Sequence, residues 1–137
     1  MPGTGQSIGV RVWWPVVATT LAFVGLFLMP GDELQTDSWW AVWHMDKVLH
    51  AMAFAFWGLT IAIAWAKQRL YPGRAFALRL IGLGVIFGTV LEVMQGAWMA
   101  GRTADPWDLV ADVAGTAFAL GLFKWIFGRW PGRIAAD

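Results

Sequence analysis

The chain has 137 residues, of which 58% are hydrophobic and only 14% are charged. A soluble domain usually carries about 25% charged residues, so this composition indicates a membrane protein and argues against an ordinary soluble fold. The net charge of +1 gives no sign of nucleic-acid binding, and the absence of cysteine excludes disulfides, thiolate metal sites and cysteine nucleophiles.

Four stretches are long and apolar enough to cross a bilayer, whose hydrocarbon core is spanned by about 20 helical residues. They lie near residues 12–29, 45–66, 76–98 and 107–127. We expect the first to be a retained helix and not a cleaved signal peptide, because its apolar run ends in FLMPGDE without a small-residue cleavage site. The predicted fold is all-α: one domain over 1–137, built as a bundle of four transmembrane helices.

The positive charges predict how this bundle is oriented. All but two of the lysines and arginines lie before the first stretch, around the joint between the second and third, or at the end of the fourth and beyond it; the exceptions are Lys47 and Arg102. The side of a membrane that carries most Lys and Arg is the cytoplasmic side. We therefore expect both termini in the cytoplasm (N-in/C-in), with Lys47 and Arg102 at the outer end.

Polar residues enter the second and third stretches from this outer end. The second begins with MDKVLH, in which Asp46 and His50 are four residues apart and share a helix face, with Lys47 close by. The third contains Glu92 and Gln95, which are three residues apart on one face. Ionisable residues inside a membrane helix are rare and usually face the bundle interior.

The fourth stretch follows the segment GRTADPWDLVAD, in which Asp105, Asp108 and Asp112 form one helical stripe. Asp105 precedes a proline, which predicts an N-cap with proline at the first helical position. Asp108 would then lie near the positive end of the helix dipole. Asp112 is too far inside the helix to be a cap.

Three predicted helices thus bring ionisable groups to a similar depth: His50, Glu92 and Asp112. This pattern predicts one buried polar cluster that opens to the outer side, with Lys47 and Arg102 as counter-ions. Structural clamping of the helices is the alternative role. The sequence contains no Ser-His-Asp spacing and no HExxH motif, so we expect no metal and no cofactor. Whether the protein is an enzyme is left open, and the sequence favours a protein that is not one.

Small residues predict where the helices approach closely. Gly84 and Gly88 form a GxxxG pair in the third helix, and Ala111 and Gly115 form a small-xxx-small pair in the fourth. Gly115 lies three residues after Asp112, on the same side of its helix.

The motifs DKVLH, EVMQ and GRTADPWDLVADVAG, in this order, resemble the VanZ-like family of small bacterial membrane proteins. The matching positions are Asp46, Lys47 and His50 in the first motif, Glu92 and Gln95 in the second, and Arg102, Asp108 and Gly115 in the third. The chain departs from the family at Asp112, where asparagine is the commoner residue. The resemblance covers residues 39–120.

The resemblance implies a cell-envelope role in the bacterial cytoplasmic (inner) membrane. The family is named for a protein associated with resistance to the glycopeptide antibiotic teicoplanin. The first functional hypothesis is that the cluster recognises or moves a cell-envelope lipid, another amphiphile or an antibiotic-related ligand, with Lys47 and Arg102 contacting its phosphate or carboxylate.

Two alternatives stay open. One is a non-catalytic protein that stabilises or regulates an envelope membrane protein. The other is an enzyme that acts on a lipid-linked phosphate, using His, Glu and Asp side chains as metal ligands or as general acid and base. The expected partners are the lipid bilayer and either a second copy of the chain or another membrane protein, and no nucleic acid.

Overall fold

The structure is a computed structural model that describes residues 10–29, 45–68, 73–98, 104–128 and 130. Its elements are a short 3-10 helix η1 (Val10–Trp13) and the helices α1 (Trp14–Phe27), α4 (Met45–Gln68), α5 (Gly73–Trp98) and α6 (Pro106–Phe127). Four helical segments are long and apolar enough to cross a membrane, and the described residues contain no strand. The prediction of an all-α, multi-pass membrane protein is therefore confirmed.

The helices agree with the apolar stretches to within a few residues. α4 continues to Gln68, because Lys67 and Gln68 form helices well and extend the span beyond its apolar part, and α5 begins at Gly73. α6 begins at Pro106 and ends at Phe127, and it is followed by Gly128, whose φ of 63° is the left-handed conformation that commonly closes a helix.

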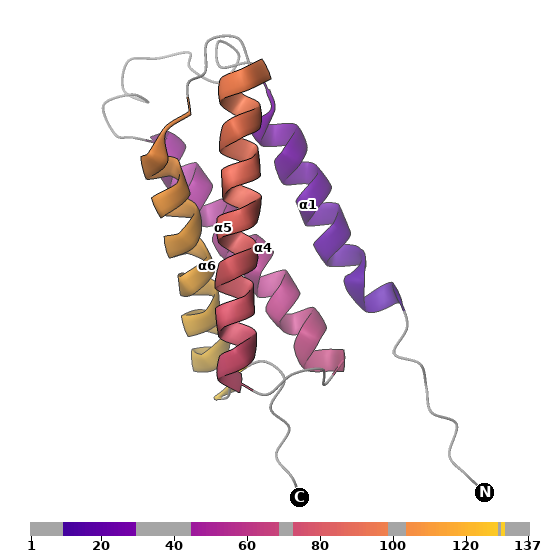
Figure 1. Cartoon of the computed structure of the whole chain (residues 1–137). Coiled ribbons are helices and arrows are strands. Elements are labelled where there is room, and N and C mark those ends of the chain that lie inside the picture. Colours follow the sequence, from indigo (N-terminus) through magenta and orange to yellow (C-terminus); the bar gives the residue numbers. More distant parts are fainter. Residues whose placement is uncertain (1–9, 30–44, 69–72, 99–103, 129, 131–137) are drawn as a thin grey trace, which may run out of the picture.

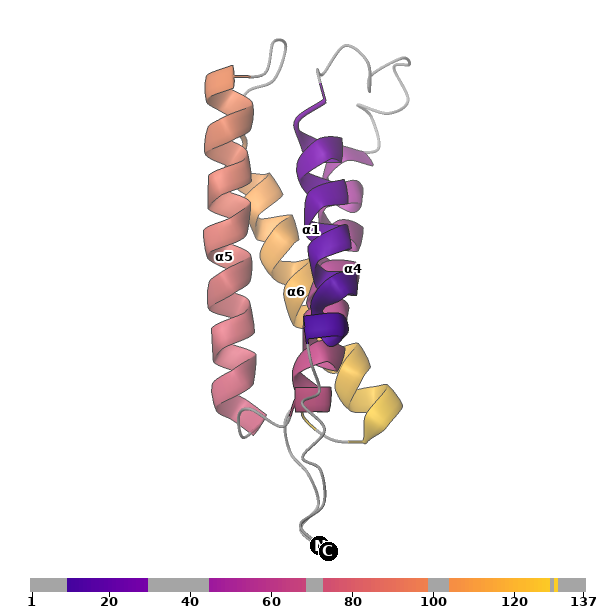
Figure 2. The ribbon, with the colours of Figure 1, turned by 90° about the vertical axis from the view of Figure 1, so that its right-hand side faces the viewer.

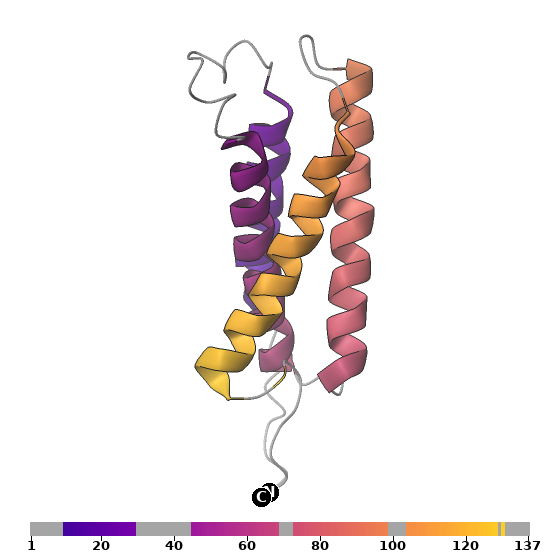
Figure 3. The same cartoon turned by 90° about the vertical axis from the view of Figure 1, so that its left-hand side faces the viewer.

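The four long helices run alternately up and down (Figure 1). α6 makes its most extensive contacts with α4 and its next most extensive with α5, whereas α1 packs mainly on α4. Figure 2 shows α1 covering α4 on one face, and Figure 3 shows α6 crossing obliquely between α4 and α5 on another. α6 is thus the helix that joins the other parts of the bundle.

The contact between α6 and α4 depends on glycine. A β-carbon at Gly115 would overlap the backbone carbonyl oxygen of Ala51, and a β-carbon at Gly58 would lie 3.0 Å from that of Ala119. Without a strong hydrophobic drive between helices in lipid, such close backbone approach is a main source of helix association.

The contact between α6 and α5 has the same character. A β-carbon at Gly84 would lie 2.6 Å from the Thr116 hydroxyl oxygen, and one at Gly88 would lie 2.5 Å from Oδ2 of Asp112. The glycines singled out in the sequence therefore lie at helix contacts, and Gly88 lies directly against a buried carboxylate.

The middle of the bundle is an aromatic core. Phe54, Trp57 and Phe87 are in mutual ring contact, and Phe54 is completely buried. The indole Nε1 of Trp57 donates a hydrogen bond to Thr20 Oγ1 at 2.9 Å, which ties α4 to α1. Large apolar side chains such as Phe118 remain exposed on the outside of the bundle, as expected for a surface that faces lipid.

Candidate functional site

Three helices bring their polar residues together at one end of the bundle, where α4 and α6 begin and α5 ends. We call this group the polar cluster. Its buried members are His50, Glu92, Gln95, Asp108 and Asp112, and its partly exposed members are Asp46, Lys47 and Asp105. The cluster predicted from the sequence is therefore present, apart from Arg102, which lies outside the described residues.

Lys47 lies at the edge of the polar cluster, with 24% of its side chain exposed. Its Nζ atom donates to Asp105 Oδ2 at 2.6 Å, to Asp108 Oδ1 at 2.9 Å and to Asp46 Oδ2 at 3.1 Å. An ammonium group has three donors. The carboxylates therefore use the full donor capacity of Lys47.

Asp105 connects the helices in three ways. Its Oδ1 accepts from the backbone N–H of Trp107 at 2.9 Å, which is the N-cap expected from the sequence. Its Oδ2 accepts from Lys47 of α4, and its own backbone N–H donates to Glu92 Oε2 of α5 at 2.8 Å. The capping residue is thus also part of the polar cluster, a role that its position before a proline does not indicate.

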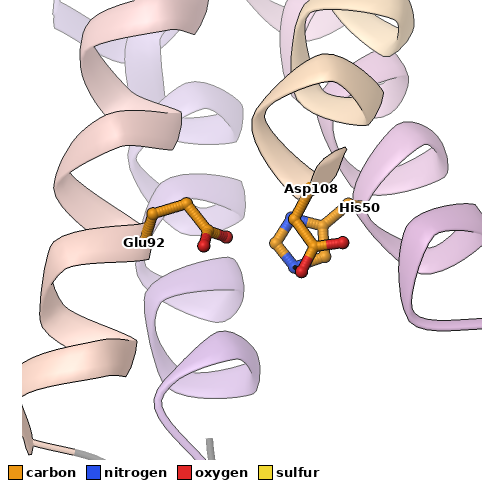
Figure 4. A group of neighbouring side chains, drawn as sticks. All are labelled: His50, Glu92 and Asp108. Carbon is orange, nitrogen blue, oxygen red and sulfur yellow. Dashed lines mark ion pairs between the residues drawn. The ribbon is translucent and has the colours of Figure 1, made fainter. Parts of the chain in front are cut away.

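His50 and Asp112 form the most deeply buried pair. Nδ1 of His50 lies 2.8 Å from Oδ1 of Asp112, whose side chain is completely buried. With Asp112 ionised, the tautomer of His50 that satisfies this contact carries its hydrogen on Nδ1 and donates it. On the other side of the ring, Nε2 faces Asp108 Oδ2 at 4.0 Å. Figure 4 shows Glu92 extending from α5 toward His50 and Asp108.

α1 contributes to the polar cluster through its last residue. The backbone carbonyl of Phe27, at the end of α1, accepts a hydrogen bond from Gln95 Nε2 at 2.9 Å. The Phe27 ring packs on the imidazole of His50 with centroids 4.2 Å apart. Sequence analysis missed this residue, and the only available signal was that the last carbonyls of a helix need hydrogen-bond donors outside it.

Two buried carboxylate oxygens have no hydrogen-bond partner among the described residues: Glu92 Oε1 and Asp112 Oδ2. Glu92 is 6% exposed and Asp112 is 0% exposed, so water at the surface does not compensate for the missing partners. A buried acceptor without a donor is unfavourable by about 1–3 kcal/mol, and more when it is charged. The polar cluster therefore has unused capacity to bind a donor or a cation.

Two apolar pockets that share Ala114 lie on the outside of the bundle between α4 and α6, and together we call them the lateral groove. Its upper part is lined by Lys47, Trp107, Val110, Ala111 and Ala114, and its lower part by Ala51, Met52, Ala55, Ala114, Gly115 and Phe118. Ala114 belongs to both parts, and Lys47 belongs to both the groove and the polar cluster. The upper part of the lateral groove therefore borders the polar cluster at Lys47.

No protein-family model matches the chain, and neither the curated proteins nor the solved structures contain a significant match to it. The resemblance to the VanZ-like family therefore depends on the three sequence motifs alone.

Proposed function

We propose that this protein is a VanZ-like membrane protein that recognises an amphiphile of the bacterial cell envelope at the outer side of the cytoplasmic membrane. The apolar tail of the ligand would lie in the lateral groove, and its head group would contact the polar cluster. The protein would then recognise or move this ligand without catalysing a reaction.

One observation carries the proposal: Lys47 lines the lateral groove and is bonded to three carboxylates of the polar cluster. A site for an amphiphile requires an apolar surface for the tail, next to a polar group of defined position for the head group. A cluster that only clamped the helices would not require a groove that ends on one of its charged members.

The charges of the polar cluster define the head group. It contains five carboxylates, from Asp46, Glu92, Asp105, Asp108 and Asp112, but only Lys47 and His50 as bases among the described residues. Because Lys47 already has three acceptors, direct binding of a phosphate by its ammonium group is disfavoured. The head group would instead present hydrogen-bond donors to the unpartnered oxygens, or reach the cluster through a bound cation.

The proposal can be tested by measuring lipid retention. The protein, expressed in a bacterial membrane and purified in mild detergent, should retain co-purifying lipid that native mass spectrometry detects. Ala114→Trp fills the lateral groove at the point shared by its two parts, so we expect it to reduce retention at least tenfold. Ile86→Trp is the matched control, because Ile86 is exposed on α5 and does not line the groove.

A second measurement addresses function in cells. A deletion strain should show a changed sensitivity to envelope-active amphiphiles, and wild-type protein should reverse it. Glu92→Gln keeps an acceptor for the backbone N–H of Asp105 but removes the charge, so we expect a stable protein that fails to rescue. Full rescue by Glu92→Gln, together with equal lipid retention by both groove variants, would refute the proposal.

A further inference from the structure

We propose that the polar cluster binds one divalent transition-metal ion through His50, Glu92 and Asp108. One ligand atom from each of these residues lies within 4.8 Å of the other two, and all three residues are buried. Three atoms at such separations have a common point within about 2.8 Å of each, which is 4.8 Å divided by √3. Metal–ligand distances to nitrogen and oxygen are about 2.0–2.2 Å, so small side-chain rotations complete the site.

His50 is held in the orientation of a metal ligand. Its Nδ1 lies 2.8 Å from Asp112 Oδ1, and Nε2 is directed toward Asp108; in the tautomer that donates Nδ1–H to Asp112, Nε2 is the free ligand atom. A carboxylate that accepts from the far nitrogen of the ring is the usual support of a histidine that binds a metal, because it sets the tautomer and increases the basicity of the ligating nitrogen.

The two carboxylates are supported in the same way, each through one oxygen. Oδ1 of Asp108 accepts from Lys47 at 2.9 Å, which leaves Oδ2 on the side of His50. Oε2 of Glu92 accepts from the backbone N–H of Asp105 at 2.8 Å, which leaves Oε1 free. Every ligand is thus fixed by a different partner and keeps one atom for an ion.

With Glu92 and Asp108 ionised, the free atoms are all acceptors, and a bound cation would satisfy all three of them. Nε2 of neutral His50 and the carboxylate oxygens of Glu92 and Asp108 cannot donate to one another. A second proton on His50 does not solve the problem, because the 4.0 Å from Nε2 to Asp108 Oδ2 exceeds a hydrogen bond. Glu92, only 6% exposed, would still hold Oε1 without a donor from the described part of the chain.

A neighbouring group of acids provides an internal comparison. Asp46, Asp105 and Asp108 also bring carboxylate oxygens within 4.8 Å of one another. The Lys47 ammonium group contacts all three, so this second group already contains its cation. Between His50, Glu92 and Asp108, no described residue supplies such a charge.

The ligand set defines the class of ion. One imidazole nitrogen and two carboxylates suit Zn²⁺ or Mn²⁺ better than Ca²⁺ or Mg²⁺, which prefer oxygen ligands alone. Three protein ligands leave a coordination position open. That position would receive an anionic head group; this last step rests on the proposed function, whereas the ion site does not.

Metal binding by the full-length protein tests the site. The protein is purified in detergent, stripped with EDTA and titrated with Zn²⁺, and the bound metal is measured by mass spectrometry after dialysis. We expect one Zn²⁺ per chain. Glu92→Gln should weaken binding at least about 100-fold and Asp112→Asn, which changes only the support of His50, about 10–100-fold. Asp46→Asn removes an acid from the same end of the bundle without touching a ligand, so it should change the affinity less than about threefold.

Two results would overturn the ion site: wild-type protein that retains no Zn²⁺, or equal weakening by all three variants, which would indicate a diffuse acidic surface. Should Glu92→Gln fail to fold, Co²⁺ replaces Zn²⁺ in the wild type. Strong visible absorption of a four- or five-coordinate ion supports the site, and the weak spectrum of an octahedral ion contradicts it.

Lipid retention is measured with and without EDTA. Bound Zn²⁺ without lipid refutes only the proposed function, and retention unaffected by EDTA refutes only the link between the ion and the head group.

Discussion

Lys47 and Asp105 are 58 positions apart in the chain, and Nζ of the first lies 2.6 Å from Oδ2 of the second. This ion pair joins the start of α4 to the N-cap of α6 and is the shortest polar contact described in the cluster. Because Asp105 also donates its backbone N–H to Glu92, the pair positions a residue on the third helix. A change at either residue should therefore affect both stability and the site.

We expect Lys47→Met to destabilise the bundle by about 2 kcal/mol, because it leaves three carboxylates without their common cation; the value lies below that of a fully buried pair because Lys47 is partly exposed. Lys67→Met is the control, since Lys67 is exposed at the other end of α4. Unfolding in mixed micelles measures both. Equal stability of the two variants would show that the ion pairs contribute nothing net.

Gly115→Ala should destabilise the protein by about 1–3 kcal/mol, because its β-carbon would overlap the backbone carbonyl of Ala51, which cannot rotate away. Gly121→Ala lies on the same helix and meets nothing within 4 Å. It should leave stability unchanged or raise it by up to about 1 kcal/mol through helix propensity. Thermal unfolding in detergent distinguishes the two, and a similar loss in both variants would contradict the packing described for α6.

Thr20→Val should loosen α1, because the Thr20 hydroxyl accepts the hydrogen bond of the buried Trp57 indole. The expected loss is about 1 kcal/mol, the net value of a typical hydrogen bond. Thr89→Val is a matched control, since the Thr89 hydroxyl bonds only to Val85 O of its own helix. Protease cleavage of α1 in the purified protein should accelerate for the first variant alone; identical cleavage rates would contradict the proposed tie.

Orientation in the membrane can be mapped directly, because the chain contains no cysteine. Ala104→Cys lies at the end of the bundle that carries the polar cluster, and Ala75→Cys lies at the opposite end; both positions are exposed. An impermeant maleimide added to spheroplasts should label residue 104 and not residue 75, as the positive charges predict. Labelling of residue 75 alone would reverse the predicted orientation.

The sequence was sufficient for the features that depend on local pattern. Hydropathy predicted the four helices, and the Asp-Pro pair predicted the N-cap at Asp105. Helical spacing and depth also predicted that His50, Glu92 and Asp112 meet at one end of the bundle. A charged side chain on a helix surrounded by lipid is stable only when it faces the neighbouring helices.

The features that escaped prediction depend on how the helices rotate and cross. Spacing does not reveal that Lys47 would bond to three acids, or that the cap at Asp105 would also hold Glu92. The contact of Phe27 with His50 was equally hidden, since an apolar residue at the end of α1 resembles any other. The angles at which helices cross depend on the whole bundle, so the sequence of one helix does not predict them.

Gly88 has a consequence for how this protein can change over evolution. Its missing β-carbon leaves space for Oδ2 of Asp112, to which a side chain at position 88 would approach to 2.5 Å. A larger residue at position 88 would displace the Asp112 carboxylate and also Cδ1 of Leu109, which lies 2.9 Å from the same β-carbon, and a displaced Asp112 would no longer support His50 in its present position. Related sequences should show correlated substitution at this pair, and an attempt to engineer α5 at position 88 should start from position 112.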